Sequence, residues 1–307
     1  MPTPQSGVLP DANTHALFLT LAVHSTGGDT ESLGNRIAAI PGLVADLSKP
    51  APEADLHAVV AVGADCWDRA FPGTRPSALR PFAQFADGGR VAPATPADIF
   101  VHIRSERHDV NFDLGRAVLR ALGAGVSVIE EIAGFRYRDS RDLIGFVDGT
   151  ENPQGDDRAA VALVGDEDPA FAAGSYISIQ RYIHDLAHWE EVPVADQEQI
   201  IGRTKADNIE FKSEDKAPTA HIKRVSIKKD GKSLEILRHS MPYGSVSEHG
   251  LYFVAYCGTP DNFDRMLERM IVADANGDFD HLLRFSRAVT GASFFAPSLD
   301  FLRRYEA

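Results

Sequence analysis

One carboxylate near the middle of the chain constrains fold and function more than any other feature. Asp148 ends the apolar run 143–147 and leads directly into the turn-forming sequence Gly-Thr-Glu-Asn-Pro. Burying a lone carboxylate costs several kcal/mol unless a cation or hydrogen bonds compensate it. Gly145 and Gly149 allow a backbone to approach a bulky group closely. The stretch is therefore either a turn in which Asp148 caps backbone amides or a functional site, and the spacing leaves both readings open.

The composition is that of a globular protein with one large domain or two of ordinary size. The chain has 307 residues, and its hydrophobic content of 44% is enough to build a core in each domain. Its net charge of -13 repels nucleic acid and anionic membrane surfaces, so neither is expected as a partner. No apolar run approaches the roughly 20 residues that span a bilayer, so we expect no transmembrane segment.

The cysteines and the N-terminus indicate a cytoplasmic protein. Cys66 and Cys257 lie far apart and outside any CxxC pattern, so we expect reduced thiols and no zinc cluster. Residues 1–13 have neither a basic and apolar export signal nor a twin-arginine pair.

The first half of the chain predicts strands and helices in the order β-α-β-β-α-β. Strands are expected at 15–24, 56–63, 98–104 and 126–132, and helices at 31–47 and 111–122. Pro41 and Gly42 should kink or split the first helix. The alternation in 98–104 is typical of a half-buried strand, and the stretch between the second and third strands has no regular pattern. This order is that of a ferredoxin-like unit, with helices on one face of an antiparallel sheet.

The second half repeats this architecture without a convincing repeat of residues. Strands are expected at 174–183, 233–240 and 250–257, helices at 195–203 and 262–273, and a final extended piece around Phe294 and Phe295. The two sheets would pair or pack face to face and leave a cavity in one half. We place the boundary at about residues 145–155, which gives domains at 1–150 and 151–307.

Two further residues bear on Asp148. His221, in the segment 218–225, has the side chain that most often binds metals and that takes an axial position on haem iron. A single histidine among 11 is more often structural. Arg238 ends an expected strand and needs an anion if it is buried, for which Asp148 is a candidate. It could equally form a surface salt bridge, which is worth at most about 1 kcal/mol.

Seven segments carry a resemblance to a known family. They are GFVDGTENP, QRYIHDL, IGRTK, AHIKR, ILRHSMPYG, GLYFVAY and VTGASFFAPSLDFL, in this order from residue 145 to residue 302. Through them the sequence resembles the dye-decolorising peroxidases, and specifically the shorter bacterial B-type members. The resemblance implies an α+β fold of two tandem ferredoxin-like halves with antiparallel sheets, of the dimeric α/β-barrel-like superfamily. The second half would bind haem.

The resemblance also implies a set of site residues around one haem b per chain. His221 would be the proximal iron ligand, Asp148 the distal acid and Arg238 the distal arginine beside it, the latter two being catalytic. Ser240 stands where some relatives have asparagine, which puts manganese oxidation in doubt. Asp280 is a candidate partner of His221 or merely a helix cap, and Arg203 may pair with a haem propionate. The other expected cofactor-binding residues are Gly149, Thr150, Glu151, Leu251 and Phe253.

The activity implied is that of a haem peroxidase. Hydrogen peroxide would be used to oxidise dyes, phenols or other aromatic donors through a ferryl porphyrin-radical intermediate, in a homo-oligomer of two or more chains. Electrons could leave through Trp67, Trp189, Tyr137 or Tyr243, although packing is the simpler role for most of them. One alternative is a haem-handling protein for storage, transfer or iron release with incidental peroxidase activity. Another is a haem-free ligand sensor.

Overall fold

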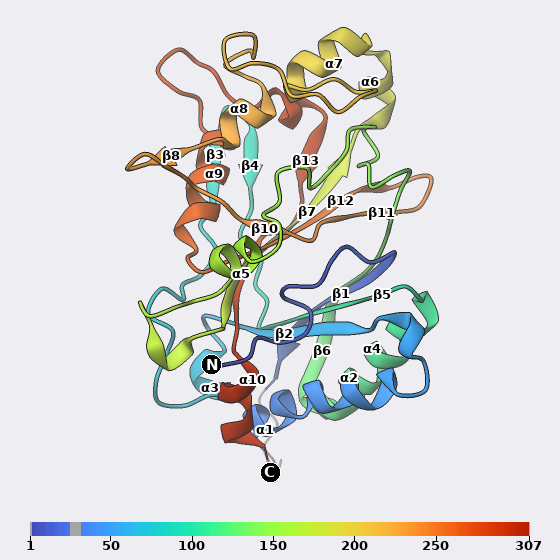
Figure 1. Ribbon diagram of the computed structural model, residues 1–307, viewed down its shortest axis with the longest axis vertical. Coiled ribbons are helices and arrows are strands. Elements are labelled where there is room, and N and C mark those ends of the chain that lie inside the picture. The colour runs from blue at the N-terminus through green and yellow to red at the C-terminus, as the bar shows by residue number, and fades with distance from the viewer. Residues whose placement is uncertain (1, 25–31, 307) are drawn as a thin grey trace.

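The computed structural model describes residues 2–24 and 32–306 (Figure 1). The first half forms the lower part of the molecule in this view (Figure 1), except for the hairpin β3–β4 (residues 85–92), which lies in the upper part beside α9 (Asp261–Ile271). Its elements are β1 (His15–Val23), α1 (Leu33–Ala38), α2 (Ile40–Ser48), β2 (His57–Gly63), α3 (Trp67–Ala70), β3 (Phe85–Asp87), β4 (Arg90–Ala92), β5 (Ile99–Ser105), α4 (His108–Leu122) and β6 (Val126–Phe135).

The second half forms the upper part, except that the C-terminal helix returns to pack beside α1 (Figure 1). Its helices are α5 (Asp157–Ala162), α6 (Leu186–Glu191), α7 (Val194–Ile201), α8 (His221–Val225), α9 (Asp261–Ile271) and α10 (Leu299–Leu302). Its strands are β7 (Ser175–His184), β8 (Lys228–Lys229), β9 (Lys232–Ser233), β10 (Leu237–Arg238), β11 (Met241–Gly244), β12 (His249–Cys257), β13 (Ser286–Ala288) and β14 (Ala292–Ala296). Short 3-10 helices lie at Pro52–Ala54, Gly123–Gly125, Pro169–Phe171, His281–Arg284 and Arg303–Tyr305.

The main strands of both halves join in one antiparallel sheet. Its order is β10-β12-β11-β6-β1-β5-β2-β14-β7-β13, and β12 also pairs with β7, so the strands between them close into a ring. The halves meet where Tyr243 of β11 faces Gly134 of β6 and where β14 pairs with β2. The expectation that the two sheets would pair is therefore confirmed, and the fold is α+β with antiparallel strands.

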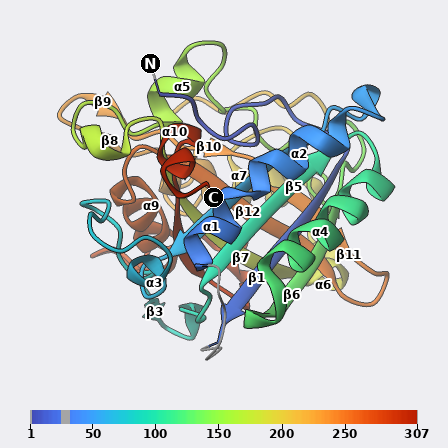
Figure 2. The same ribbon diagram turned by 90° about the horizontal axis from the view of Figure 1, so that it is seen from below.

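Two large cores lie on opposite faces of these strands. Inside the ring, Phe18, Phe100, Tyr252 and Phe294 pack together with other buried side chains. Outside it, α1, α2 and α4 cover the first half of the sheet, as Figure 2 shows. Helix α4 follows the 3.6-residue period, with Val110, Leu114, Val118 and Leu122 buried on one face.

Most of the predicted elements are confirmed. The first predicted helix is split at Ala39, two residues before Pro41, and its predicted start at Glu31 lies outside the described residues. The strand expected at 98–104 is present as β5, but the prediction that it is half-buried is wrong. Every one of its residues is buried, because one face packs inside the ring and the other under α4.

The strand predicted at 233–240 is wrong in position. The regular pairing with β12 runs from Leu237 to Gly244, as β10 and β11 in one continuous register. His239 and Ser240 interrupt it, and the Ser240 hydroxyl accepts the Val254 N–H at 3.3 Å. The hairpin β3–β4 and helix α6 were not predicted.

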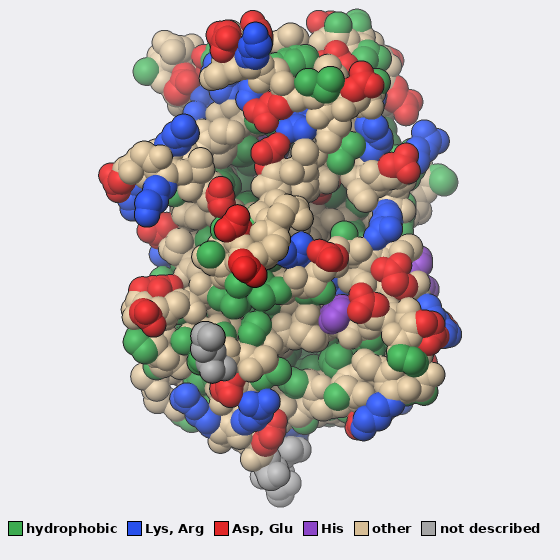
Figure 3. All heavy atoms as spheres, viewed as in Figure 1, with side chains coloured by type: hydrophobic (Ala, Val, Ile, Leu, Met, Phe, Trp, Pro, Cys, Tyr) green, Lys and Arg blue, Asp and Glu red, His purple; other side chains and the backbone are tan. Residues whose placement is uncertain are grey.

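Surface features agree with the composition. Acidic side chains are spread over the face shown in Figure 3 rather than gathered in one patch. Cys66 and Cys257 are both free and buried, and burial raises the pKa of Cys66 to about 12. Among residues 2–24 and 32–306, no helix is long and apolar enough to cross a membrane.

Candidate functional site: a polar-edged cavity in the second half

A cavity of about 390 Å³ opens in the second half of the molecule. It lies outside the strand ring, against β7 and β12 and beneath α8 and α9. All nine residues predicted for the site line it. They are Asp148, Gly149, Thr150, Glu151, His221, Arg238, Ser240, Leu251 and Phe253. Arg203 lines it too, whereas Asp280 lies behind His221 and is fully buried.

The turn that carries Asp148 begins as a short, buried bridge. Ile144 and Phe146 pack on Trp189 and Ile201, and Val147 pairs with Arg141. Gly145 has a φ of +92°, and a Cβ there would lie 2.5 Å from the Lys205 side chain, so this position requires glycine. The buried bridge thus delivers the next residue, Asp148, to the rim of the cavity.

Asp148 and Arg238 form a loose, half-buried pair. The nearest oxygen and guanidinium nitrogen are 3.9 Å apart, and the side chains are 25% and 22% exposed. Asp148 also accepts the Gly149 N–H at 2.7 Å, so the capping role is present beside the pairing with Arg238. The gap between the two groups leaves both with hydrogen-bonding capacity toward the cavity.

His221 begins α8 and is held from behind by a buried carboxylate. Its Nδ1 lies 2.6 Å from Oδ2 of Asp280, which is 0% exposed. The other Asp280 oxygen accepts the Leu282 N–H at 3.0 Å, so this residue is both a cap and the histidine's partner. Burial acts to lower the pKa of His221, but the charge and hydrogen bond of Asp280 outweigh it and the pKa is raised.

Helix α8 is anchored by an arginine that sequence reasoning did not single out. Arg224 is buried and donates to the carbonyls of Arg269 and Val272 at the end of α9, and to Asp274. This fixes a helix of five residues that would be unstable alone. His221 is thereby held at the cavity wall.

A second histidine lines the cavity but is fully engaged. His184 Nε2 lies 3.1 Å from Asp142, and its Nδ1 lies 2.9 Å from the Ser286 hydroxyl. Of the two histidines among the described lining residues, His221 is therefore the one whose second nitrogen, Nε2, is left for a ligand. A neutral His221 would donate Nδ1–H to Asp280 and present the Nε2 lone pair.

The floor of the cavity contains polar groups that were missed. Ser178, Gln180 and Tyr182 alternate along β7, and Leu251 and Phe253 lie on the same face of the adjacent β12. Gln180 donates to Ser178 at 2.7 Å. The signal was present in the sequence, because polar residues at every second position mark one face of an otherwise apolar strand.

Arg203 is occupied by protein groups. It donates to Glu151 at 2.6 Å, to the Asn208 carbonyl at 2.9 Å and to Glu210 at 3.3 Å. Of the residues named as electron exits, Trp67, Trp189 and Tyr243 are buried, while Tyr137 is partly exposed. The packing role is therefore the simpler one for both tryptophans.

Comparison with known proteins gives the family. The model for Dyp-type peroxidase, N-terminal, matches residues 5–136, and that for Dyp-type peroxidase, C-terminal, matches residues 139–301. A curated dye-decolorizing peroxidase of Mycobacterium tuberculosis is 42% identical over 298 residues, which cover 96% of this chain and 88% of the relative. The chain belongs to the Dyp-type peroxidase family. It is a hydrogen-peroxide-dependent peroxidase.

Solved structures agree. A Dyp-type protein from Shewanella oneidensis is 47% identical, covers 100% of both chains and superposes with a TM-score of 0.95. A variant of DypB from Rhodococcus jostii RHA1 in complex with heme is 40% identical, with a TM-score of 0.93 and 97% of each chain covered. The peroxidase names favour an enzyme over the haem-handling and haem-free alternatives.

Proposed function

We propose that this chain is a haem b peroxidase whose cavity in the second half holds one haem, with His221 as the iron ligand. The observation that carries the proposal is the meeting, in one cavity, of His221 backed by Asp280 with the pair Asp148 and Arg238. The free Nε2 of His221 and the apolar lining fit the group. The apolar lining includes Leu251, Phe253, Phe263, Met266 and Met270.

The protein's own groups would manage protons and charge. A bound haem supplies two electrons to split hydrogen peroxide and is reduced again by two one-electron donors. Asp148 takes the proton from one peroxide oxygen and returns it to the other, which leaves as water. Arg238 stabilises the negative charge that grows on the leaving oxygen. A carrier of haem would need His221 but neither of these groups.

The remaining pocket residues would position the cofactor. Gly149, Thr150 and Glu151 border the cavity beside Asp148, and Glu151 is oriented by Arg203. The Ser240 hydroxyl is already hydrogen-bonded to a backbone N–H, so it is a poor substitute for an asparagine amide. We therefore expect no manganese oxidation that depends on this position. The donors proposed are dyes, phenols or other aromatic reductants.

Each half of the fold is proposed to be a ferredoxin-like unit. The main strands of the first half, in chain order, are β1, β2, β5 and β6, and those of the second are β7, β11, β12 and β14. In both halves the fourth strand lies beside the first, the first beside the third and the third beside the second. The proposed division stays at 1–150 and 151–307, whereas the two family matches meet earlier, the first ending at residue 136 and the second beginning at residue 139.

A homo-oligomer in the cytoplasm completes the proposal. Phe112 of α4 and Val128 and Ile129 of β6 are exposed apolar side chains that a second copy would cover. The free, buried cysteines suit a reducing compartment. Light scattering after gel filtration tests the assembly, and a monomer at micromolar concentration would contradict it.

The central experiment combines absorption spectra with two variants. The purified protein should show a Soret band of histidine-bound ferric haem, as isolated or after haemin addition, that changes with one equivalent of hydrogen peroxide. Asp148→Ala and Arg238→Leu should slow this change by about 10²–10⁴-fold because an acid-base group or a fixed cation is lost. Stopped-flow rates within threefold of wild type for both would exclude them as catalytic.

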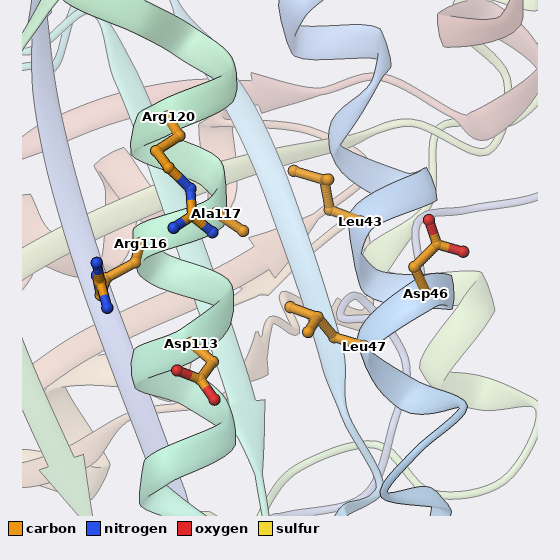
Figure 4. Close-up of a pocket in the computed structure, with 7 residues that line it drawn as sticks. All are labelled: Leu43, Asp46, Leu47, Asp113, Arg116, Ala117 and Arg120. Atoms are coloured by element: carbon orange, nitrogen blue, oxygen red, sulfur yellow. The ribbon is translucent and has the colours of Figure 1, made fainter.

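A matched control lies far from the cavity. Figure 4 shows a shallow groove between α2 and α4, where Leu43 and Leu47 point toward Ala117, with Arg116 and Arg120 on the same helix α4. Arg116→Leu makes the same chemical change as Arg238→Leu but touches no cavity residue. It should leave the peroxide reaction unchanged.

A further inference from the structure

Three consecutive side chains after Gly149 tie the Asp148 turn to other segments. Thr150 accepts a hydrogen bond from Asn208 at 3.0 Å, and Glu151 accepts one from Arg203 at 2.6 Å. Both of these contacts lie on the side of residues 203–210. Asn152 makes the third connection, to the strand that carries Arg238.

Asn152 binds Arg238 through both ends of its amide. Its Nδ2 donates to the Arg238 carbonyl at 2.8 Å, and its Oδ1 accepts the Arg238 N–H at 3.0 Å. Its own N–H donates to the Gly149 carbonyl at 3.0 Å and closes the turn. One side chain therefore joins the backbone positions that carry the two groups of the distal pair.

This connection matters because β10 has a strand on one side only among the described residues, although Leu237 anchors it in the core. The strand has two residues, lies at the end of the sheet order and, within residues 2–24 and 32–306, pairs with β12 alone. Asn152 satisfies the outward-facing backbone groups of Arg238 as a neighbouring strand would. Among the described residues the guanidinium has one ion-pair partner, Asp148, at 3.9 Å. Its location is therefore set by where its backbone is held.

We propose that Asn152 is a positioning residue that sets the separation of Arg238 from Asp148. The inference rests on the proposed function, in which these two side chains act on peroxide. Asn152 does not line the cavity and acts only through Arg238. Its sequence separation from Arg238, 86 residues, means that it couples two parts of the chain that meet only in the folded state.

The first test is Asn152→Ala in the haem-loaded protein. The peroxide-driven change of the Soret band should slow by roughly 10- to 100-fold, since small displacements of a catalytic group carry penalties of this size. The dissociation constant of cyanide, measured by spectral titration without turnover, should also rise. Gln154→Ala is the control, because in the described part of the chain this exposed side chain donates to the Asn152 carbonyl and to no other group. It should match wild type in both measurements.

The second test asks whether Asn152 acts through Arg238. In an Arg238→Leu background, Asn152→Ala should add less than a threefold loss, because residues that act as one unit are not additive. If Asn152→Ala fails to fold, Asn152→Asp replaces it. That variant has the same shape and keeps the acceptor for the Arg238 N–H, and it should be slowed because it loses the donor to the carbonyl.

The outcomes distinguish a failure of the positioning role of Asn152 from a failure of the proposed function of Asp148 and Arg238. Asn152→Ala within twofold of wild type, with Arg238→Leu slow, would overturn the positioning role alone. Full additivity of the two losses would overturn it as well, because it would indicate a general structural effect. If Arg238→Leu and Asp148→Ala are themselves unimpaired, the proposed function of the pair fails first.

Discussion

The first half of the molecule is filled where the second half is hollow. In both halves the first strand faces the ring interior with one set of side chains and an outer layer of helices with the other. On β1 the outward set is Leu17, Leu19 and Leu21, all buried in the core with α4. On β7 the outward set is Ser178, Gln180 and Tyr182, all of which line the cavity.

The helices that cover the sheet also differ between the two halves. Helix α4 is one continuous helix of 15 residues that seals its half. In the second half the helices between β7 and β10 are the short α6, α7 and α8, and α9 presents Met266 and Met270 to the cavity. A cavity of this kind thus arises from small or polar side chains on one strand face together with a broken helical layer. The first half is closely packed with leucines on that strand face and one unbroken helix over them.

The largest expected effect is on the hollow half alone. His221→Ala should abolish stoichiometric haem binding, because the free ligand nitrogen is lost, while the packed half keeps its core. Soret absorbance per chain after haemin addition and gel filtration measures the loss. His188→Ala, which removes an exposed histidine bonded to Asp185, is the control and should load fully. A His221→Ala protein with an unchanged Soret band would assign the ligand elsewhere.

The packed half should show the opposite response. Leu114→Ala removes a fully buried side chain of α4 and should lower the free energy of unfolding by about 2–5 kcal/mol, while haem loading stays intact. Met270→Ala, at the cavity wall, should cost less stability and weaken haem affinity instead. Urea unfolding of the haem-free proteins and haem titration measure the two effects. Equal stability losses would contradict the contrast between the halves.

Helices and strands were predicted correctly where the apolar pattern of one segment alone determines its structure. The strands β1 and β2 are short apolar runs, and the helices α4 and α9 follow the helical period of apolar residues. Prediction failed where distant contacts decide. Pro242 and Gly244 disfavour a strand locally, yet β11 forms because β12 supplies its pairing. The hairpin β3–β4 is held by Arg90, which donates to the Ile271 carbonyl at the end of α9.

The site divides in the same way. Asp148, His221 and Arg238 were predicted because each lies in a recognisable local motif. The link from His221 to Asp280 spans 59 residues, and its distance is a property of the folded chain. Asp280 was named as a candidate partner of His221, whereas the contact of Asn152 with Arg238, 86 residues away, was not predicted. Local sequence thus indicated the groups that are proposed to act, while tertiary packing determines how they are held.

Asp280→Asn separates the two roles of Asp280 in the second half, the charge beside His221 and the cap on Leu282. Asparagine keeps an oxygen for the Leu282 N–H, so the cap survives while the charge beside His221 is lost. Haem affinity should fall about 10- to 100-fold, and the reduction potential of the bound haem should rise, because the histidine donates less strongly. Potentiometric titration and haem transfer measure both. An unchanged potential would leave Asp280 with its capping role alone.

The smallest expected effect lies in the ring interior that the two halves share. His102 of β5 hydrogen-bonds the Tyr256 hydroxyl at 2.8 Å, and His239 bonds the Val8 carbonyl at the same distance. Burial, and then the charge of Arg104, holds the pKa of both histidines well below the ordinary value. Both are therefore neutral in the folded protein.

The sign of the pH dependence follows. Below about pH 6.5 these histidines bind protons in the unfolded chain but stay neutral in the folded protein. The free energy of unfolding therefore falls as the pH drops, by roughly 1.4 kcal/mol per pH unit for each histidine. His102→Gln should flatten the loss between pH 6.5 and 5 by one histidine's share, measured by urea unfolding. His188→Gln should instead steepen it slightly, because Asp185 raises the pKa of that exposed histidine. Equal slopes in all three proteins would mean that His102 takes up its proton without unfolding the shared core.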